Sequence, residues 1–216
     1  FTDYSGDSPD FNVIPTMSPL VTSQKENGEY NINPLGDFRL NPFLQAQSDN
    51  RDLRNNISAI LYADVKIPFI EGLSYRVNFS NNYRWSNFST SNPYDGGLAG
   101  RAQKNNSWTH DLLLDNILTY TKEINSNHRL TLTGLYGFNK IVFDETRAVG
   151  TDFTNLTLSY NSLQQALIQR IGSSAWEESY LYQMGRFAYD FKRRYLFTAT
   201  IRRDGFSGFS ENNKFG

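Results

Sequence analysis

The strongest constraint in this sequence is a long alternation of apolar and polar side chains over residues 73–85. One set of alternate positions is apolar or aromatic and the other is polar, as in Tyr75, Val77 and Phe79 against Arg76 and Asn78. Side chains of a β-strand point alternately to opposite faces, so a period of two predicts a strand. The strand is about a dozen residues long, with one apolar face and one wet face.

The same alternation recurs along the chain with short connections. Residues 55–65 form a predicted strand that a turn connects to the run at 73–85. Residues 111–121 pair in the same way with 129–139, and residues 179–191 pair with 195–204. A three-residue loop at 192–194 would place Phe191 opposite Tyr195 and keep the aromatic side chains on one face. We therefore predict about six antiparallel strands in three hairpins.

The connections between hairpins, 86–109 and 140–177, are much longer than those within them. Short turns at one end, long loops at the other and alternating strands of about ten residues are typical of outer-membrane β-barrels. Residues 1–53 show no sustained period, and we interpret them as an extracellular loop region before a strand. Residues 54–216 are then barrel strands and loops.

Aromatic residues near the ends of the predicted strands also fit a barrel, because such barrels carry aromatic girdles at both membrane interfaces. Between Tyr75 and Tyr83 the chain would rise about 21 Å at a tilt near 40°, close to the height of the apolar band. The candidate girdle or mouth residues are Tyr75, Tyr83, Trp85, Trp108, Tyr120, Tyr136, Trp176, Tyr189 and Tyr195. Trp85, Trp108 and Trp176 are alternatively placed to stack on sugar rings.

Two other interpretations remain open at this point. A secreted, soluble carbohydrate-binding β-sandwich would also alternate, although soluble strands average only about five or six residues. A barrel acting as an adhesin or receptor is a further alternative. Six strands fall below the minimum of about eight for a closed membrane barrel, so we expect this chain to be a piece of a longer one.

Composition excludes several classes of function. The net charge of −1 and the absence of a Lys/Arg cluster argue against nucleic acid as a partner. There is no cysteine, and the two histidines, His110 and His128, are predicted at opposite ends of one hairpin, too far apart to share a site. No pattern for a nucleophile, a phosphate cradle or a metal indicates an enzyme, and we expect no cofactor and no metal. The apolar runs are too short for a transmembrane helix.

The C-terminal stretch carries a resemblance to a known family. Tyr195 to Phe209 reads YLFTATIRRDGFSGF and is followed by Asn212-Asn213-Lys214-Phe215-Gly216. This closely resembles the SusC/RagA-type TonB-dependent transporters of Bacteroidota, in which a strand ends in Arg-Arg-Asp-Gly before Phe-Gly and an Asn-rich turn. The sequence departs from that pattern at Phe206 and Gly208. Ile70 to Tyr75 and Asn161 to Leu163 are similar to other parts of the family.

The resemblance implies a large barrel of about 22 strands with a plugged lumen, in the bacterial outer membrane. It also implies import of oligosaccharides or peptides, with energy supplied through TonB by a plug outside these residues. A SusD-like surface lipoprotein would close over the extracellular mouth, and outer-membrane lipid would surround the wall.

Charged and amide side chains on the wet face are the candidate lumen or substrate residues. On the lipid side, an arginine near the bilayer midplane would cost about 2 to 4 kcal/mol. The candidates are Arg76, Asn78, Asn82, Arg84, Asp111, Asp115, Arg186, Arg202 and Asp204. Most of these are better explained as solvated wall residues or plug contacts than as substrate ligands, and Arg202, Arg203 and Asp204 are expected to form a structural ion-pair network. Residues 162–171 are predicted to form a short amphipathic helix that docks on the lipoprotein or packs in its own loop.

Overall fold

The structure is a computed structural model that describes residues 2–3, 15, 22–32, 41–94, 100–210 and 215. Its dominant elements are β2 (Asp49–Lys66), β3 (Leu73–Asn92), β4 (Arg101–Asn125), β5 (His128–Phe153), β6 (Ala166–Phe191) and β7 (Tyr195–Phe206). The short strand β1 (Thr2–Asp3) pairs with β2 at Arg54 and Leu53. The 3₁₀ turns are η2 (Pro42–Gln47), η4 (Ser159–Asn161) and η5 (Leu163–Gln165).

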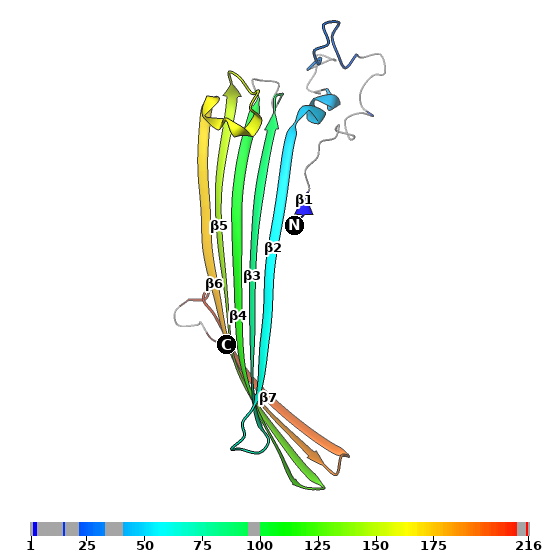
Figure 1. Cartoon of the computed structure of the whole chain (residues 1–216), viewed down its shortest axis with the longest axis vertical. Coiled ribbons are helices and arrows are strands. Elements are labelled where there is room, and N and C mark those ends of the chain that lie inside the picture. Colours follow the sequence, from blue (N-terminus) through cyan, green and yellow to red (C-terminus); the bar gives the residue numbers. More distant parts are fainter. Residues whose placement is uncertain are drawn as a thin grey trace. The chain divides into compact units, whose positions relative to one another are not determined.

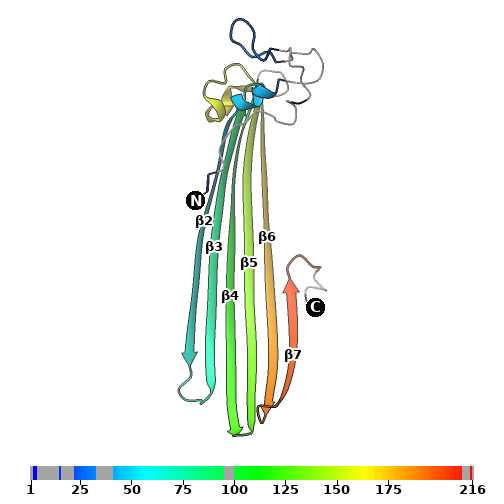
Figure 2. The same cartoon turned by 90° about the vertical axis from the view of Figure 1, so that its right-hand side faces the viewer.

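All seven strands form one sheet in chain order, and the six long strands are antiparallel (Figures 1 and 2). The prediction of six antiparallel strands in three hairpins is therefore confirmed. The predicted register is confirmed as well, because Phe191 pairs with Tyr195, Tyr189 with Phe197 and Phe187 with Ala199. None of the helices within the described residues is long and apolar enough to cross a membrane.

The chain divides into two compact units. The first contains residues 1–55, 85–108 and 144–174, and the second contains residues 56–84, 109–143 and 175–216. The second unit holds the short connections 67–72, 126–127 and 192–194, and the first holds 93–100 and 154–165. The predicted asymmetry between short and long connections is thus present.

The strands are longer than the alternation predicted. Much of the expected loops 86–109 and 140–177 is strand: β3 extends to Asn92, β4 starts at Arg101, β5 ends at Phe153 and β6 starts at Ala166. The extra segments carry polar residues on both faces, as in Ser86-Asn87-Phe88-Ser89-Thr90-Ser91, so the period of two disappears while the pairing continues. Residues 95–99 of the first loop lie outside the described residues.

At the other boundary, β2 begins at Asp49, so its first five residues, 49–53, lie in the region expected to be loop. Residues 4–14, 16–21 and 33–40 of that region lie outside the described residues.

The predicted helix over 162–171 is wrong. Leu163–Gln165 make a single 3₁₀ turn, and Ala166 already begins β6. The spacing of Leu163, Leu167 and Ile171 is four residues, and residues four apart share a face in a strand as well as in a helix. This spacing therefore does not distinguish the two structures.

A small core in the first unit holds the second long connection in place. Ala102, Phe153 and Ala166 are buried, and Leu156, Tyr160 and Leu163 pack against them. Asn161 accepts a hydrogen bond from Lys104 Nζ at 3.1 Å, and the same ammonium lies over the Tyr160 ring. Residues 154–165 are thus a packed loop that rests on the end of its own strands.

The turn between β2 and β3 depends on Gly72. Its φ is +87°, and a Cβ at this position would lie 1.9 Å from the carbonyl oxygen of Thr121 in β4. The same close approach allows the Thr121 N–H to donate to the Gly72 carbonyl oxygen at 2.8 Å. Only glycine can both adopt this backbone conformation and pass so near the neighbouring strand.

We predict that Gly72→Ala destabilises the folded protein markedly, because a backbone clash adds to the roughly 1 to 2 kcal/mol cost of a positive φ. The measurement is the midpoint of thermal unfolding of the purified protein. Gly28→Ala is the matched control, since Gly28 has a φ of +82° with nothing within 4 Å of the added Cβ. Equal midpoints for the two variants would contradict the assigned role of Gly72.

Candidate functional site: a polar face of the sheet

Side-chain contacts within the second unit define two faces of the sheet. On the first, the polar face, Arg76 lies 3.8 Å from the Asp64 carboxylate and donates to Asn78 at 2.9 Å. Ser58 donates to Asn82 at 3.1 Å on the same face. The predicted candidates Arg76, Asn78 and Asn82 are thus brought together, each held by a neighbour one strand or two residues away.

The centre of the polar face is a network around Asp115. Tyr182 Oη in β6 donates to Asp115 Oδ1 in β4 at 2.5 Å, across the intervening β5. The tyrosine ring fits there because β5 carries Gly137 below it, and a Cβ on Gly137 would come within 2.0 Å of the ring. The missing side chain in β5 therefore lets two strands that are not neighbours join directly.

The network continues into β7 through a cation–π contact. The guanidinium of Arg202 lies 5.3 Å from the centre of the Tyr182 ring, and its Nε and Nη2 donate to both oxygens of Asp204 at 2.8 to 3.0 Å. Both charged side chains remain about half exposed, so the pair adds little to stability by itself. Arg203 lies on the opposite face, and the ion pair predicted for all three residues contains only Arg202 and Asp204.

Other predicted candidates on this face are less constrained. Asp111 accepts a hydrogen bond from Asn139 Nδ2 at 2.7 Å. Arg84 and Arg186 are exposed, and no carboxylate of the described residues contacts either of them. The polar face thus combines mutually satisfied groups with arginines whose charge is available to a solute or to another part of the protein.

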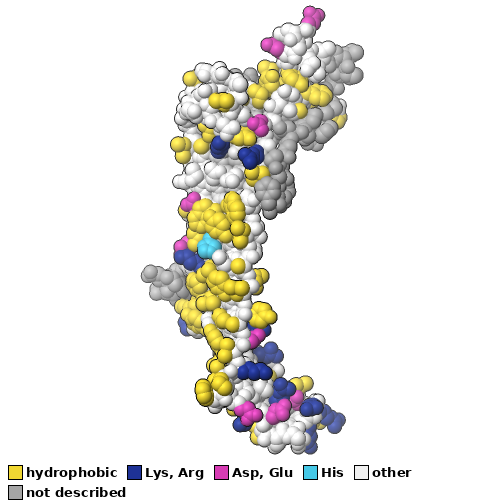
Figure 3. Space-filling model, in the orientation of Figure 1, with side chains coloured by type: hydrophobic (Ala, Val, Ile, Leu, Met, Phe, Trp, Pro, Cys, Tyr) yellow, Lys and Arg dark blue, Asp and Glu magenta, His cyan; other side chains and the backbone are white. Residues whose placement is uncertain are grey.

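The opposite face of the second unit, the apolar face, is largely hydrophobic and exposed. Ile57 is 62% exposed and Ile201 is 78% exposed. Monomeric soluble proteins rarely expose hydrophobic side chains over so wide a surface. In Figure 3, hydrophobic side chains gather along the strands and Lys and Arg gather near the short turns. The face includes Ile57, Leu61, Val65, Tyr75, Val77, Phe79, Leu118, Leu132, Phe187, Phe197 and Ile201.

Polar groups that fall on the apolar face are satisfied within the sheet. Tyr75 Oη donates to Asn116 Oδ1 at 2.5 Å, and Asn116 Nδ2 donates to the backbone oxygen of Tyr136 at 3.3 Å. His110 Nε2 lies 2.6 Å from Asn81 Oδ1. These contacts lower the cost of placing amide and imidazole groups among hydrocarbon side chains.

The predicted girdle aromatics divide between the two faces. On the apolar face, Tyr83 lies 6.0 Å from the His110 ring, the Tyr189 hydroxyl contacts His128, and Tyr195 stacks on Phe191 at 6.3 Å. Tyr120 is partly buried in β4, and Trp85 and Trp108 are partly buried in the β3 and β4 segments of the first unit.

Trp176 instead stacks on Phe143 at 5.4 Å. In β5, Phe143 has the same parity as Asn139, which is on the polar face. Trp176 therefore lies on the polar face, and its role as girdle or mouth residue stays a prediction.

The first unit holds charged residues that the sequence analysis missed. Arg147 Nη2 donates to Gln103 at 2.9 Å, and Asn105 Nδ2 donates to Glu145 at 2.9 Å. Arg101, Arg147 and Arg170 line a hollow of about 400 Å³ together with Val149, Thr151 and Ile168. These residues were missed because Arg101 and Arg147 fall in segments that were predicted to be loops, and Arg170 falls in the segment 162–171 that was predicted to be a helix.

Metal chemistry finds no support in the described residues. Within them, no three His, Cys, Asp or Glu side chains lie close enough together to hold a metal ion. His110 and His128 each contact a different tyrosine. His128 is the first residue of β5, beside the short turn, whereas His110 lies inside β4, fifteen residues before its end at Asn125.

Comparison with known proteins assigns the family. No family model matches the chain. Three TonB-dependent receptors of Formosa agariphila are similar to it: P3 at 33% identity over 92% of the chain, P39 at 28% over 82%, and P26 at 27% over 94%. The chain belongs to the TonB-dependent receptor family. It spans about a fifth of the length of each of these receptors, 18% to 21%.

Solved structures agree with this assignment at the level of fold. The chain is similar to the RagAB peptide transporter, with a TM-score of 0.75 and 20% identity over 88% of this chain and 22% of that chain. The RagAB peptide importer in the closed-closed state gives a TM-score of 0.72 with 18% identity over the same shares. The predicted SusC/RagA-like barrel wall and its location in the outer membrane are confirmed. A two-layer sandwich is wrong, because the described strands form a single sheet.

We predict that Gly137→Ala disrupts the polar network of this receptor segment, because the added methyl displaces Tyr182 from Asp115. The complete receptor in detergent should lose about 1 kcal/mol or more of stability, the typical value of one buried hydrogen bond. Its thermal midpoint should fall accordingly.

Gly134→Ala is the matched control on the same strand, since nothing lies within 4 Å of a Cβ built there. A Gly137→Ala midpoint as high as that of Gly134→Ala would show that the Tyr182 ring does not depend on the missing side chain.

Proposed function

We propose that this chain forms part of the wall of an importer that moves oligosaccharides or peptides across the bacterial outer membrane. The observation that carries the proposal is the chemical difference between the two faces of one continuous sheet. A wall between hydrocarbon and an aqueous lumen requires this division, with apolar side chains on one side and polar ones on the other.

The polar face is then the lumen side. Arg76, Arg84, Arg186 and Arg202 project from it, and each would be costly in contact with lipid. The network of Asp115, Tyr182 and Arg202 stiffens the wall, while exposed Arg84 and Arg186 are available to the plug or to a solute. These groups bind and orient, and we propose no catalytic role for them. The named relatives are likewise receptors and transporters.

The connections set the orientation. We propose that 93–100 and 154–165 lie on the extracellular side and that 67–72, 126–127 and 192–194 lie on the periplasmic side, as in other barrels with long external loops. The family resemblance supports two partners: a TonB protein, reached through a plug outside these residues, and a SusD-like lipoprotein over the mouth.

The charge of the first unit supports a class of solute. Arg147 and Arg170 line the 400 Å³ hollow, and the hydrogen bond that is described for Arg147 goes to a neutral amide. Guanidinium groups bind carboxylate and sulfate in a bidentate manner. We therefore propose that the imported solute carries negatively charged groups.

The orientation is tested by labelling single cysteines in the complete receptor on intact cells with a membrane-impermeant maleimide. Leu158→Cys, in the long connection, should react because Leu158 is 56% exposed. Arg193→Cys, in a short turn, should react only after the cells are lysed. Labelling of Arg193→Cys on intact cells, with protection of Leu158→Cys, would reverse the proposed orientation.

The solute class is tested by uptake of labelled oligogalacturonate and of a neutral malto-oligosaccharide into cells that express the complete receptor. Arg147→Gln with Arg170→Gln should raise the half-saturating concentration of the acidic sugar by about tenfold, the scale of a lost charge-assisted hydrogen bond.

Lys104→Gln is the control, since it removes a positive charge of the same unit outside the hollow. An equal effect on acidic and neutral sugars, or no effect of the double substitution, would contradict an anionic solute.

A further inference from the structure

Two stacked pairs of aromatic rings lie on the polar face of the second unit. Trp176 in β6 stacks on Phe143 in β5, with ring centres 5.4 Å apart. Tyr180, also in β6, stacks on Phe206 in β7 at 4.6 Å. Tyr180 has the same parity as Tyr182 of the polar network, and Phe206 is directly opposite Tyr180 in the register. Aromatic girdles face lipid, so these two pairs need another explanation.

The ring of Phe206 is held against Tyr180 by its own surroundings. A Cβ on Gly208 would lie 2.5 Å from the Phe206 ring, so the missing side chain makes room for that ring. Phe209 packs edge-on against it, with ring centres 5.2 Å apart. Phe206 is thus a fixed support for Tyr180.

The other ring of each pair is open to a solute. Trp176 is 44% exposed and Tyr180 is 36% exposed, whereas their partners Phe143 and Phe206 are partly buried. A supported ring loses little freedom when a ligand packs on its free face, because its orientation is already set. The two pairs therefore present flat surfaces that are prepared for binding.

The Trp176 pair lies at the edge of the apolar band. On the opposite face, the apolar positions of β5 end with Phe138, and the next is Lys140, whose Nζ lies 2.7 Å from Glu177 Oε1 in β6. Charged side chains are costly in contact with lipid, so this ion pair marks the level at which the wall leaves hydrocarbon. Trp176 is one residue farther from the short turns than Glu177. Its ring therefore lies where both faces of the wall meet water.

An acidic side chain lies between the two open rings. Glu178 shares their face of β6, and its Oε2 accepts a hydrogen bond from Tyr180 Oη at 3.2 Å. A carboxylate can accept further hydrogen bonds besides this one. In a strand, residues two apart are separated by about 7 Å and residues four apart by about 14 Å. Trp176, Glu178 and Tyr180, which we call the aromatic row, thus offer a ring, an acceptor and a ring in a line.

This combination matches the chemistry of a sugar chain. The face of an aromatic ring carries partial negative charge, so it attracts the C–H groups on the face of a sugar ring. Hydroxyl groups on the rim of the sugar can donate to a carboxylate. An extended peptide that binds through its main chain needs the free edge of a strand, whereas the aromatic row offers side chains on the face of a sheet.

We propose that the aromatic row binds the imported oligosaccharide, with one sugar ring stacked on Trp176, another on Tyr180 and a hydroxyl group donating to Glu178. This inference rests on the proposed function and deepens it, because it selects an oligosaccharide over a peptide. A negatively charged group at the rim of a sugar ring leaves the C–H face free to stack, so the row and an anionic solute are compatible.

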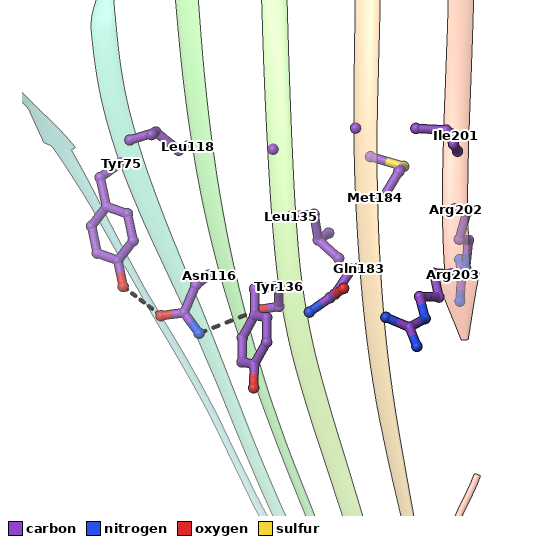
Figure 4. Close-up of a pocket in the computed structure, with 12 residues that line it drawn as sticks. Tyr75, Asn116, Leu118, Leu135, Tyr136, Gln183, Met184, Ile201, Arg202 and Arg203 are labelled. Carbon is purple, nitrogen blue, oxygen red and sulfur yellow. Dashed lines mark hydrogen bonds between the residues drawn. The ribbon is translucent and has the colours of Figure 1, made fainter. Parts of the chain in front are cut away.

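An aromatic side chain on the apolar face provides a matched control. Figure 4 shows Tyr136 with Tyr75 and Asn116, which line a hollow on that face. Tyr136 is 49% exposed, close to the value for Trp176. Tyr136→Leu therefore removes an exposed ring of the same unit and leaves the aromatic row unchanged.

The test is isothermal titration calorimetry of the complete receptor in detergent with three probes: oligogalacturonate, a neutral malto-oligosaccharide and an oligoglutamate peptide. Wild type should bind oligogalacturonate more tightly than the peptide. Trp176→Leu and Tyr180→Leu should each raise the Kd for the sugar about tenfold, the scale of a lost aromatic contact. Trp176→Tyr, which keeps a flat ring, should retain most of the affinity, and Tyr136→Leu should bind like wild type.

Equal sugar affinity of wild type, Trp176→Leu and Tyr180→Leu would overturn the proposal, and so would failure of wild type to bind either sugar. A lower thermal midpoint with unchanged affinity would also overturn it, since the rings would then pack against another part of the receptor. Equal binding of the peptide, with an equal loss in Trp176→Leu, would assign the row to peptides instead.

The proposed function fails on different results. Binding of the malto-oligosaccharide alone, weakened by Trp176→Leu, would contradict the anionic solute and leave the aromatic row in place. Loss of uptake by cells with sugar binding intact would speak only to transport. The two proposals can therefore be rejected separately.

Discussion

The structure depends on one requirement: where no water is present, every backbone N–H and C=O must form a hydrogen bond within the protein. In hydrocarbon an unpaired backbone group costs several kcal/mol, so strands can cross only when they are paired along their length. The single sheet in chain order meets this requirement with local hairpins, as the register from Phe191 opposite Tyr195 to Tyr180 opposite Phe206 shows. Pairing then fixes which side chains share a face, and the two chemically different faces follow from it.

The same obligation extends to side chains on the apolar face. The hydrogen bonds from Tyr75 to Asn116 and from Asn116 to the backbone of Tyr136 join three strands through groups that lipid could not satisfy. On the polar face the equivalent connection, from Tyr182 to Asp115, spans Gly137. Side-chain hydrogen bonds therefore connect the strands on both faces of the sheet. On the apolar face they link adjacent strands, and on the polar face one of them spans an intervening strand.

Sequence reasoning predicted the part of the fold in which the two faces differ. Residues 73–85 alternate because one face is apolar, and the three-residue turn at 192–194 could be assigned because a shorter loop would place Asp190 opposite Tyr195. Residues 86–92 and 140–153 were missed as strands, since polar residues on both faces leave no period. Pairwise contacts such as Tyr182 with Asp115 could not be predicted, because they depend on register across two hairpins and on one missing Cβ at Gly137.

The packed loop at 154–165 rests on Ala102, Phe153 and Ala166 at the ends of its own strands, and no described strand pair depends on its length. Inserting a residue inside a strand would turn every later side chain to the wrong face or require a bulge. Inserting several in this connection leaves the parity of β5 and β6 unchanged. The length of the strands is therefore constrained, whereas the length of this connection can vary without changing which side chains of β5 and β6 share a face.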